Sequence, residues 1–243
     1  MPPPIPRAQD QLFDRSRSAR EKYADLVVGQ PGWGALAWHE FVTLSSQQTP
    51  GALGYFLRKT LYPSLLGACG RNVVFGHGVV MRHPQKIRIG DDVVIDDNCL
   101  LDAKGDTNRG ITIGSRVFVG RNTILSCKNG DIDIADRANI GFNCELFSAS
   151  RVTLAPGVLM AAYVYVIGGD HDFSDPARSV LEQTRTSTGV SIGAGAWIGA
   201  GAKILDGVVI GMHAVIGAGA VVRDEVPAGA VAVGVPARVV ARR

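Results

Sequence analysis

The sequence contains few cysteines, and none of the four lies next to another. Cys69, Cys99, Cys127 and Cys144 form no C-x-x-C pair of the kind found in thiolate zinc sites, and they suggest no disulfide framework. Isolated thiols in a chain of 243 residues are typical of proteins that stay reduced. We therefore expect a cytoplasmic protein without a bound metal.

The chain also lacks long apolar runs and dense charge. No stretch reaches the roughly 18 apolar residues that a membrane-spanning helix requires. The N-terminal segment MPPPIPRAQDQ contains no apolar region typical of a secretory signal. The formal net charge is only +3, and no Lys/Arg stripe alternates with aromatic residues, so we expect no nucleic-acid partner.

What the sequence does contain is a six-residue repeat. In its C-terminal part, an aliphatic residue returns at every sixth position: Ile192, Ile198, Ile204, Ile210, Ile216 and Val222. Four positions after each of them stands a small or β-branched residue: Ala196, Ala202, Val208, Ala214, Ala220 and Val226. A period of six matches neither the 3.6 of a helix nor the 2 of a strand. It predicts six-residue sides, three of which close one coil of a triangular prism, with coils stacked about 4.7–4.9 Å apart.

The same phase is present earlier in the chain. Its aliphatic residues form four sets: Ile89, Ile95, Leu101; Ile113, Val119, Leu125; Ile134, Ile140, Leu146; and Leu154, Met160, Val166. The spacing slips between sets at DAKGDTNRG, SCKNGDID and SASRVT, which we interpret as bulges or short loops leaving the prism. A β-sandwich with frequent turns is the alternative, and the unbroken register of six hexads argues against it. A glycine often follows the aliphatic residue, and we expect it to relax the backbone at the corner.

The C-terminal run resembles a known family. Its hexads WIGAGA and VIGAGAVV and its closing GVPARV resemble the hexapeptide-repeat acyltransferases, in the branch that acetylates sugars, polysaccharides and xenobiotics. The resemblance implies a mainly β fold, a left-handed parallel β-helix, over residues 70–243. Within it we expect a loop at 168–189 and a C-terminal tail at 227–243, and before it an N-terminal helical segment at 1–69.

In this branch a loop interrupts the prism just before the tryptophan-bearing hexad and begins with a histidine that acts as general base. GGDHDFSDPARSVLEQTRTSTGV is such an interruption, and His171 lies near its start. A histidine can take the proton of an acceptor hydroxyl as that oxygen attacks the thioester of an acyl-CoA. The resemblance therefore implies direct transfer in a ternary complex. Asp170 and Asp172 could orient the ring, or they could be turn residues.

The resemblance also implies an acyl-CoA site, with acetyl-CoA as the expected co-substrate. Its candidate residues are Trp197, Ala200, Lys203, Ala218, Arg223 and Arg238. Trp197 corresponds to a tryptophan lining the cleft, and Ala200 and Ala218 to positions where the backbone contacts the pantetheine arm. Arg238 corresponds to a cation near the nucleotide phosphates, which suit its forked donors. For Lys203 and Arg223 the alternative is a solvated surface. Lysine often follows Arg223 in relatives, whereas Asp224 follows it here.

The sequence indicates the acceptor less clearly than it indicates the acyl-CoA site. Some sugar acetyltransferases carry an asparagine upstream of the base; the matching position here is Gly141, and Asn143 is two residues on. Stacked corner bulges would place Cys127, Ser148 and Gly168 in one row and Asn129, Ser150 and Asp170 in another, leading up to His171. Such a polar shelf would suit a carbohydrate hydroxyl, so we expect a sugar or surface-polysaccharide precursor as acceptor.

The first seventy residues lack the repeat and hold half of the aromatic residues. Residues 10–27 predict an amphipathic helix capped by Asp10, and residues 34–44 and 50–66 predict two more. We expect these helices to cover the open first coil of the prism, since an exposed sheet edge must be covered. The alternative is peripheral contact with the inner face of a membrane, because aromatic and leucine residues occur there beside Arg58 and Lys59.

Relatives with this prism are trimers, so the resemblance implies a homotrimer in which His171 and Trp197 serve one site from different chains. Four other functions stay open: acetylation of an antibiotic, acetylation of serine, a γ-type carbonic anhydrase, and a prism without catalysis. The short N-terminal region argues against serine. The five histidines show no close pairing of the kind that a three-histidine metal site requires.

Overall fold

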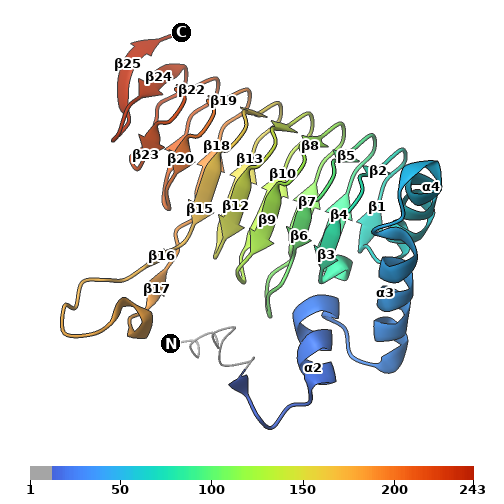
Figure 1. Cartoon of the computed structure of the whole chain (residues 1–243). Coiled ribbons are helices and arrows are strands. Elements are labelled where there is room, and N and C mark those ends of the chain that lie inside the picture. Colours follow the sequence, from blue (N-terminus) through green and yellow to red (C-terminus); the bar gives the residue numbers. More distant parts are fainter. Residues whose placement is uncertain (1–12) are drawn as a thin grey trace.

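The computed structural model describes residues 13–243, and its main body is a parallel β-solenoid with helices at one end (Figure 1). Short strands stack in three sheets, which we name faces A, B and C and which are parallel except for the last strand of face B. Face A contains β1 Ala68–Cys69, β4 Ile87–Ile89, β7 Ile111–Ile113, β10 Asp131–Ile134, β13 Arg151–Leu154, β18 Val190–Ile192 and β21 Val209–Ile210. The fold is therefore mainly β, as the resemblance to left-handed β-helices predicted.

Successive coils pass from face A to face B and then to face C. Face B contains β2 Val74–Phe75, β5 Val94–Ile95, β8 Phe118–Val119, β11 Asn139–Ile140, β14 Leu159–Met160, β19 Trp197–Ile198, β22 Val215–Ile216, β24 Ala230–Val233 and β25 Arg238–Arg242. Face C contains β3 Val80–Arg82, β6 Leu100–Asp102, β9 Ile124–Cys127, β12 Glu145–Ser148, β15 Tyr165–Gly168, β20 Lys203–Ile204 and β23 Val221–Val222.

The strand register confirms the six-residue repeat. On face B, Ile140 pairs with Val119 on one side and with Met160 on the other, and Ile198 continues the same row. The other two faces keep the predicted rows in the same way. The predicted inward residues, aliphatic and small alike, are buried in one continuous core. The pattern extends one coil further towards the N-terminus than predicted, through Cys69, Phe75 and Met81.

The corners are built differently from the prediction. The glycine after each aliphatic residue permits close approach rather than an unusual backbone: a Cβ on Gly199 would lie 2.6 Å from the backbone nitrogen of Ala218 in the next coil. The left-handed corner position lies two residues further on; glycines such as Gly195 and Gly201 occupy it in the C-terminal coils, and Asn98, Asn122 and Asn143 occupy it in earlier coils. Asparagine tolerates this conformation better than most residues, because its short side chain bonds locally.

The N-terminal helices agree with the prediction only in part. α3 (Trp33–Ser46) and α4 (Gly51–Leu61) lie where they were expected. The first predicted helix is wrong over residues 14–18, where Asp14 Oδ1 accepts from the backbone N–H of Ser16 in a turn. α2 (Ala19–Tyr23) begins only after Ser18, in a capping box with Glu21, and continues as a π-helical turn, Ala24–Val28. The expected Asp10 cap lies outside the described residues.

α4 packs on the first coil through a buried arginine. The Arg58 guanidinium donates to the backbone oxygen of Phe75 in β2 at 3.0 Å, and to those of Ser46 and Thr49 at the end of α3. Tyr62, just after α4, packs edge-on against the Phe75 ring and donates to the backbone oxygen of Val79. Within residues 13–243, no helix has the length and apolar character needed to cross a bilayer.

At the other end of the solenoid, the last coil is closed by an antiparallel pair. β24 joins face B in parallel, and β25 returns against it. The interruption between β15 and β18 is the longest connection in the solenoid. It leaves at the corner between faces C and A, where the shorter predicted loops leave as well (Figure 1).

Candidate active site

The long connection folds as a hairpin of its own. β16 (Asp170–His171) pairs antiparallel with β17 (Arg185–Thr186), so His171 lies opposite Arg185. A short 3₁₀ turn, Val180–Glu182, lies at the tip. The buried Gln183 side chain holds the tip closed, since it accepts from the backbone N–H of Asp175 and donates to the backbone oxygens of Asp175 and Arg178.

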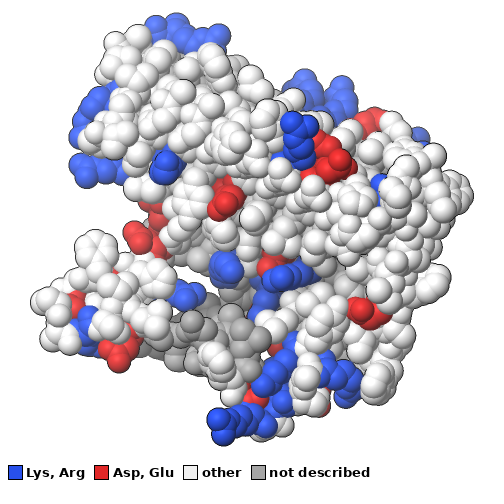
Figure 2. All heavy atoms as spheres, viewed as in Figure 1, with Lys and Arg blue, Asp and Glu red and all other residues white. Residues whose placement is uncertain are grey.

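His171 lines a cleft of about 410 Å³ between this hairpin and face C. The half-buried ring has its Nδ1 atom enclosed, without a hydrogen-bond partner among the residues that the structure describes. Figure 2 shows the hollow between the hairpin, at lower left, and the solenoid. A histidine at the wall of an open cleft is placed to exchange a proton with a bound molecule.

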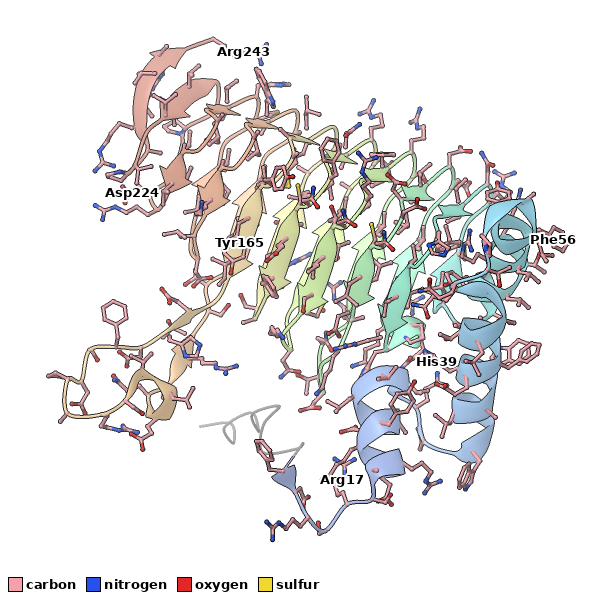
Figure 3. All side chains as sticks on the ribbon, in the orientation of Figure 1. Arg17, His39, Phe56, Tyr165, Asp224 and Arg243 are labelled. Atoms are coloured by element: carbon pink, nitrogen blue, oxygen red, sulfur yellow. The ribbon has the colours of Figure 1, made fainter. Side chains whose placement is uncertain are left out.

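The rest of the cleft lining combines aromatic and aliphatic side chains with two cations and the carboxylate of Asp170. Phe147 and Tyr165 project from neighbouring strands of face C with ring centroids 5.8 Å apart, and Ile167 lies in the same wall. Tyr165 lies on β15, the strand that leads into the hairpin (Figure 3). Lys128 and Arg185 line the cleft too, and neither side chain forms an ion pair or hydrogen bond with any described residue.

The predicted polar shelf is right only in part: Asn129, Ser150 and Asp170 of its second row are half-buried or exposed, whereas its first row points inward. Cys127, Ser148 and Gly168 are register partners, as predicted. Both side chains of that row point inward, and Ser148 Oγ donates to the backbone oxygen of Asp131. Because side chains alternate along a strand, the neighbouring positions, Phe147 and Ile167, face the cleft instead.

Neither aspartate beside His171 is hydrogen-bonded to its ring in this structure. Asp170 Oδ1 accepts from the backbone N–H of His171 at 2.7 Å. Asp172 Oδ1 accepts from the backbone N–H of Ser174, and this turn lowers the pKa of the Asp172 carboxyl. Both carboxylates thus shape the backbone that carries His171.

The cysteines are poorly suited to act as nucleophiles. Burial raises the pKa of Cys99 and Cys127 to about 12 and that of Cys144 to about 11. Cys69 is only partly buried, and burial raises its pKa as well. Since the thiolate is the reactive form, these residues resemble small core side chains more than acyl carriers.

Trp197 lies on a different face from the cleft. Its side chain projects outward from β19 on face B, where it is 48% exposed between Leu159 and Val215. Ala200 and Ala218 lie exposed at the next corner, one coil apart, and the backbone N–H of Gly219 donates to the Ala200 oxygen. Within one chain, the tryptophan does not line the cleft that contains His171.

The three basic residues proposed for acyl-CoA binding lie in two separate places, one on face C and two at the far end of the solenoid. Lys203 is exposed on face C, in register with Tyr165 of the cleft wall. Arg223 and Arg238 lie at the far end of the solenoid and share one carboxylate: Asp224 Oδ2 is 3.2 Å from Arg238 Nη1 and 3.6 Å from Arg223 Nε (Figure 3 labels Asp224). Asp224, noted above as unusual, thus bridges the two arginines in this structure.

Asn143 occupies a corner between faces B and C, at a φ of 56°. Its Oδ1 atom accepts from Asn122 Nδ2, one coil away, at 3.1 Å. It lies before β12, whereas the cleft opens at the other end of that strand, and it does not line the cleft.

Sequence reasoning missed most of the cleft lining, including the side chains of Lys128, Phe147, Tyr165 and Arg185. The available signal for the two aromatic residues was their outward position, one residue from Leu146 and Val166 in the repeat. In residues 13–243, no group of three His, Cys, Asp or Glu side chains is arranged to hold a metal ion.

Parts of this chain are similar in sequence to known proteins. The family model described as bacterial transferase hexapeptide (six repeats) matches residues 189–224. Nodulation protein L of Rhizobium leguminosarum bv. viciae is 50% identical over 102 residues, which are 42% of this chain and 53% of that protein. The probable acetyltransferase Rv3034c of Mycobacterium tuberculosis is 31% identical over 133 residues, 55% of this chain and 44% of that protein. The chain spans about half the length of the curated relatives it matches.

A solved structure extends the similarity over more of the chain. AntD, an N-acyltransferase from Bacillus cereus, in complex with dTDP and 3-hydroxybutyryl-CoA, is 25% identical with a TM-score of 0.55, covering 78% of this chain and 89% of that chain. A mutant of AntD in complex with dTDP and Coenzyme A is 26% identical with a TM-score of 0.52, covering 73% of this chain and 85% of that chain. The chain therefore carries a hexapeptide-repeat segment within a β-solenoid of the kind found in left-handed β-helices, and the proteins it is similar to include a probable acetyltransferase and an N-acyltransferase.

Proposed function

We propose that this chain is a CoA-dependent acyltransferase that moves an acyl group, in the simplest case acetyl, from acyl-CoA to a hydroxyl of a sugar or surface-polysaccharide precursor. The observation that carries the proposal is the position of His171, on a hairpin over an open cleft next to the hexapeptide coils. The relatives supply the reaction class, because AntD is an N-acyltransferase crystallised with acyl-CoA.

In the proposed reaction, His171 is the general base. The acceptor hydroxyl donates its proton to the imidazole while its oxygen attacks the thioester carbon. The tetrahedral oxyanion collapses, the carbon–sulfur bond breaks, and the CoA thiolate takes the proton back from the imidazolium. Acceptor and thioester meet in one cleft without an acyl-enzyme intermediate, which agrees with the high pKa values of the buried cysteines.

The cleft wall suits a sugar. Phe147 and Tyr165 offer flat apolar surfaces against which a pyranose ring can pack, and Lys128 and Arg185 offer donors to hydroxyl or phosphate oxygens. Asp170 and Asp172 would support the hairpin backbone, and Asn143 would reach an acceptor only from a neighbouring chain.

We also propose a homotrimer in the cytoplasm. Trp197, Ala200 and Ala218 lie away from the His171 cleft of their own chain, so one complete site would need face C of one protomer beside face B of the next. The acyl-CoA arm would then lie along Trp197 and the alanine corner. Its phosphates would lie near Arg223 and Arg238, with Lys203 along the path, and would compete with Asp224 for the two arginines.

A second acceptor class is favoured by one comparison. Another mutant of AntD, whose structure has a TM-score of 0.52 to this chain, is in complex with dTDP-4-amino-4,6-dideoxyglucose, and the cations in the cleft of this chain suit a diphosphate. The amine of a nucleotide-linked amino sugar is therefore the alternative nucleophile at the same site.

The test is thiol release from acetyl-CoA with sugars, nucleotide sugars, amino sugars and antibiotics as acceptors. On the best acceptor, His171→Ala should lower kcat by about 10²–10⁴-fold, because general-base catalysis is typically worth that much. The matched control is His213→Asn, which alters an exposed corner histidine at a φ of 58° that asparagine tolerates. Unchanged turnover in His171→Ala would rule out this mechanism, and equal loss in His213→Asn would show a general effect on folding.

A further inference from the structure

The outward face of the two longest helices is apolar and aromatic. In α3, Trp38, Phe41 and Leu44 follow one another at helical spacing and are all exposed, Leu44 by 81%. α4, which packs beside α3, exposes Leu53 and Phe56, the latter by 62%. Phe56 points away from the solenoid (Figure 3). We call these five residues the docking face.

A cap of the first coil does not require such a face. A helix that only covers a core has an apolar stripe inside and charged or polar residues outside. α3 already packs its other side inward through His39, Val42 and Ser46. Its acidic residue, Glu40, accepts a hydrogen bond from Tyr23 at 2.6 Å and so points towards α2. The docking face itself therefore carries no charge.

The part of the chain that carries this face has a net positive charge. Residues 13–90, which contain the helices, have ten Lys or Arg residues and four Asp or Glu residues, whereas residues 91–243 have 14 Lys or Arg and 17 Asp or Glu. Two cations lie against aromatic rings of the helices: Arg20 is 4.3 Å from the Trp33 ring centroid, and Lys59 Nζ is 5.9 Å from that of Tyr55. The flank over α3 and α4, at the right of Figure 2, is mostly uncharged.

We propose that the docking face lies on the surface of a bilayer that contains anionic lipid. Aromatic and leucine side chains enter the headgroup boundary, and nearby Lys and Arg attract anionic headgroups. A second copy of the chain is the less suitable occupant, because pairing two such faces would bring two positively charged ends together. The helices then have two roles: their inner side closes the solenoid and their outer side binds lipid.

The experiment is co-sedimentation of the full chain with phosphatidylcholine vesicles, with or without about 30% phosphatidylglycerol. We expect binding to the anionic vesicles that weakens as salt is raised to about 500 mM, since the cations are screened. Phe41→Gln with Leu44→Gln should lower the partition coefficient by at least about tenfold, because two exposed apolar side chains no longer enter the boundary.

Three controls accompany the vesicle-binding measurement. Val240→Gln removes an equally exposed aliphatic side chain in β25, at the opposite end of the solenoid, and should leave vesicle binding unchanged. Circular dichroism and thermal melting of the double variant should match the parent chain, because the two side chains are exposed. His171→Ala should bind vesicles as the parent does, so this result is independent of the proposed reaction.

Two results would overturn the proposal. One is a parent chain that does not bind anionic vesicles, and the other is a double variant that binds them as well as the parent. If the parent does not bind and the double variant changes the oligomeric state in sedimentation velocity, the face is an interface between copies of this chain.

Discussion

A single buried histidine ties the N-terminal helices to the first coils. His83 follows β3 at a φ of 52°, and its Nε2 atom donates to the backbone oxygen of Asp25 at 2.7 Å. Burial lowers the pKa of its imidazole, the hydrogen bond to Asp25 opposes this, and Lys86 adds to the lowering. Asp102, which raises this pKa, and Lys104, which lowers it, also face the ring.

This environment predicts a pH-dependent stability. Below the ordinary histidine pKa near 6.5, the unfolded chain binds a proton at His83 that the folded chain resists, so the free energy of unfolding should fall as the pH falls from about 7 to 5. The contribution is at most about 1.4 kcal/mol per pH unit. His83→Asn, which tolerates the left-handed backbone, should flatten the slope of urea midpoint against pH in this window. Identical slopes in parent and variant would contradict the assignment.

At the scale of elements, Arg58 connects three segments. Its guanidinium is buried without an acidic partner among the described residues, and backbone oxygens at the end of α3 and in β2 accept its donors instead. The helices are therefore attached to the solenoid by charge-assisted hydrogen bonds as well as by apolar contact.

Arg58→Met should lower the free energy of unfolding by about 2–4 kcal/mol, because it removes these bonds and leaves buried carbonyl groups without a donor. The measurement is the urea midpoint followed by circular dichroism. Lys59→Met, at the exposed neighbouring position, is the control and should change stability by less than about 0.5 kcal/mol. Similar losses in both variants would mean that the hydrogen bonds of Arg58 contribute little.

The elements also show what the sequence could and could not predict. The coils were predictable because an aliphatic side chain at every sixth position leaves one register, and Ile192 pairs with Leu154 across the hairpin as that register requires. The hairpin itself could not be predicted, because β16 and β17 have only two residues each and show no repeat of apolar residues. The aromatic cleft wall was missed because Phe147 and Tyr165 occupy outward positions, which the repeat does not specify.

At the scale of the whole molecule, each coil is stabilised by its contacts with the neighbouring coils. Each inward side chain packs against its register partners above and below, so a solenoid is stabilised mainly by contacts between neighbouring units. Ile140 is fully buried between Val119 and Met160, near the middle of face B.

Ile140→Ala should therefore lower the free energy of unfolding by about 2–5 kcal/mol, through lost apolar burial and the cavity that remains. Amide hydrogen exchange should increase most in β8, β11 and β14. Asn139→Ala, at the adjacent exposed position, should have little effect. A uniform increase in exchange along the whole solenoid would contradict transmission through neighbouring coils.

The regular stacking of the coils also sets the distance between His171 and the helical end of the solenoid. His171 follows β15, the fifth strand of face C counted from the helical end, so four strand spacings of about 4.8 Å separate its coil from the first one. With α3 and α4 resting on a bilayer and the solenoid upright, the reacting groups would stand on the order of 20 Å above the lipid headgroups. The number of coils then acts as a spacer that favours acceptor hydroxyls carried well clear of the surface over those close to it.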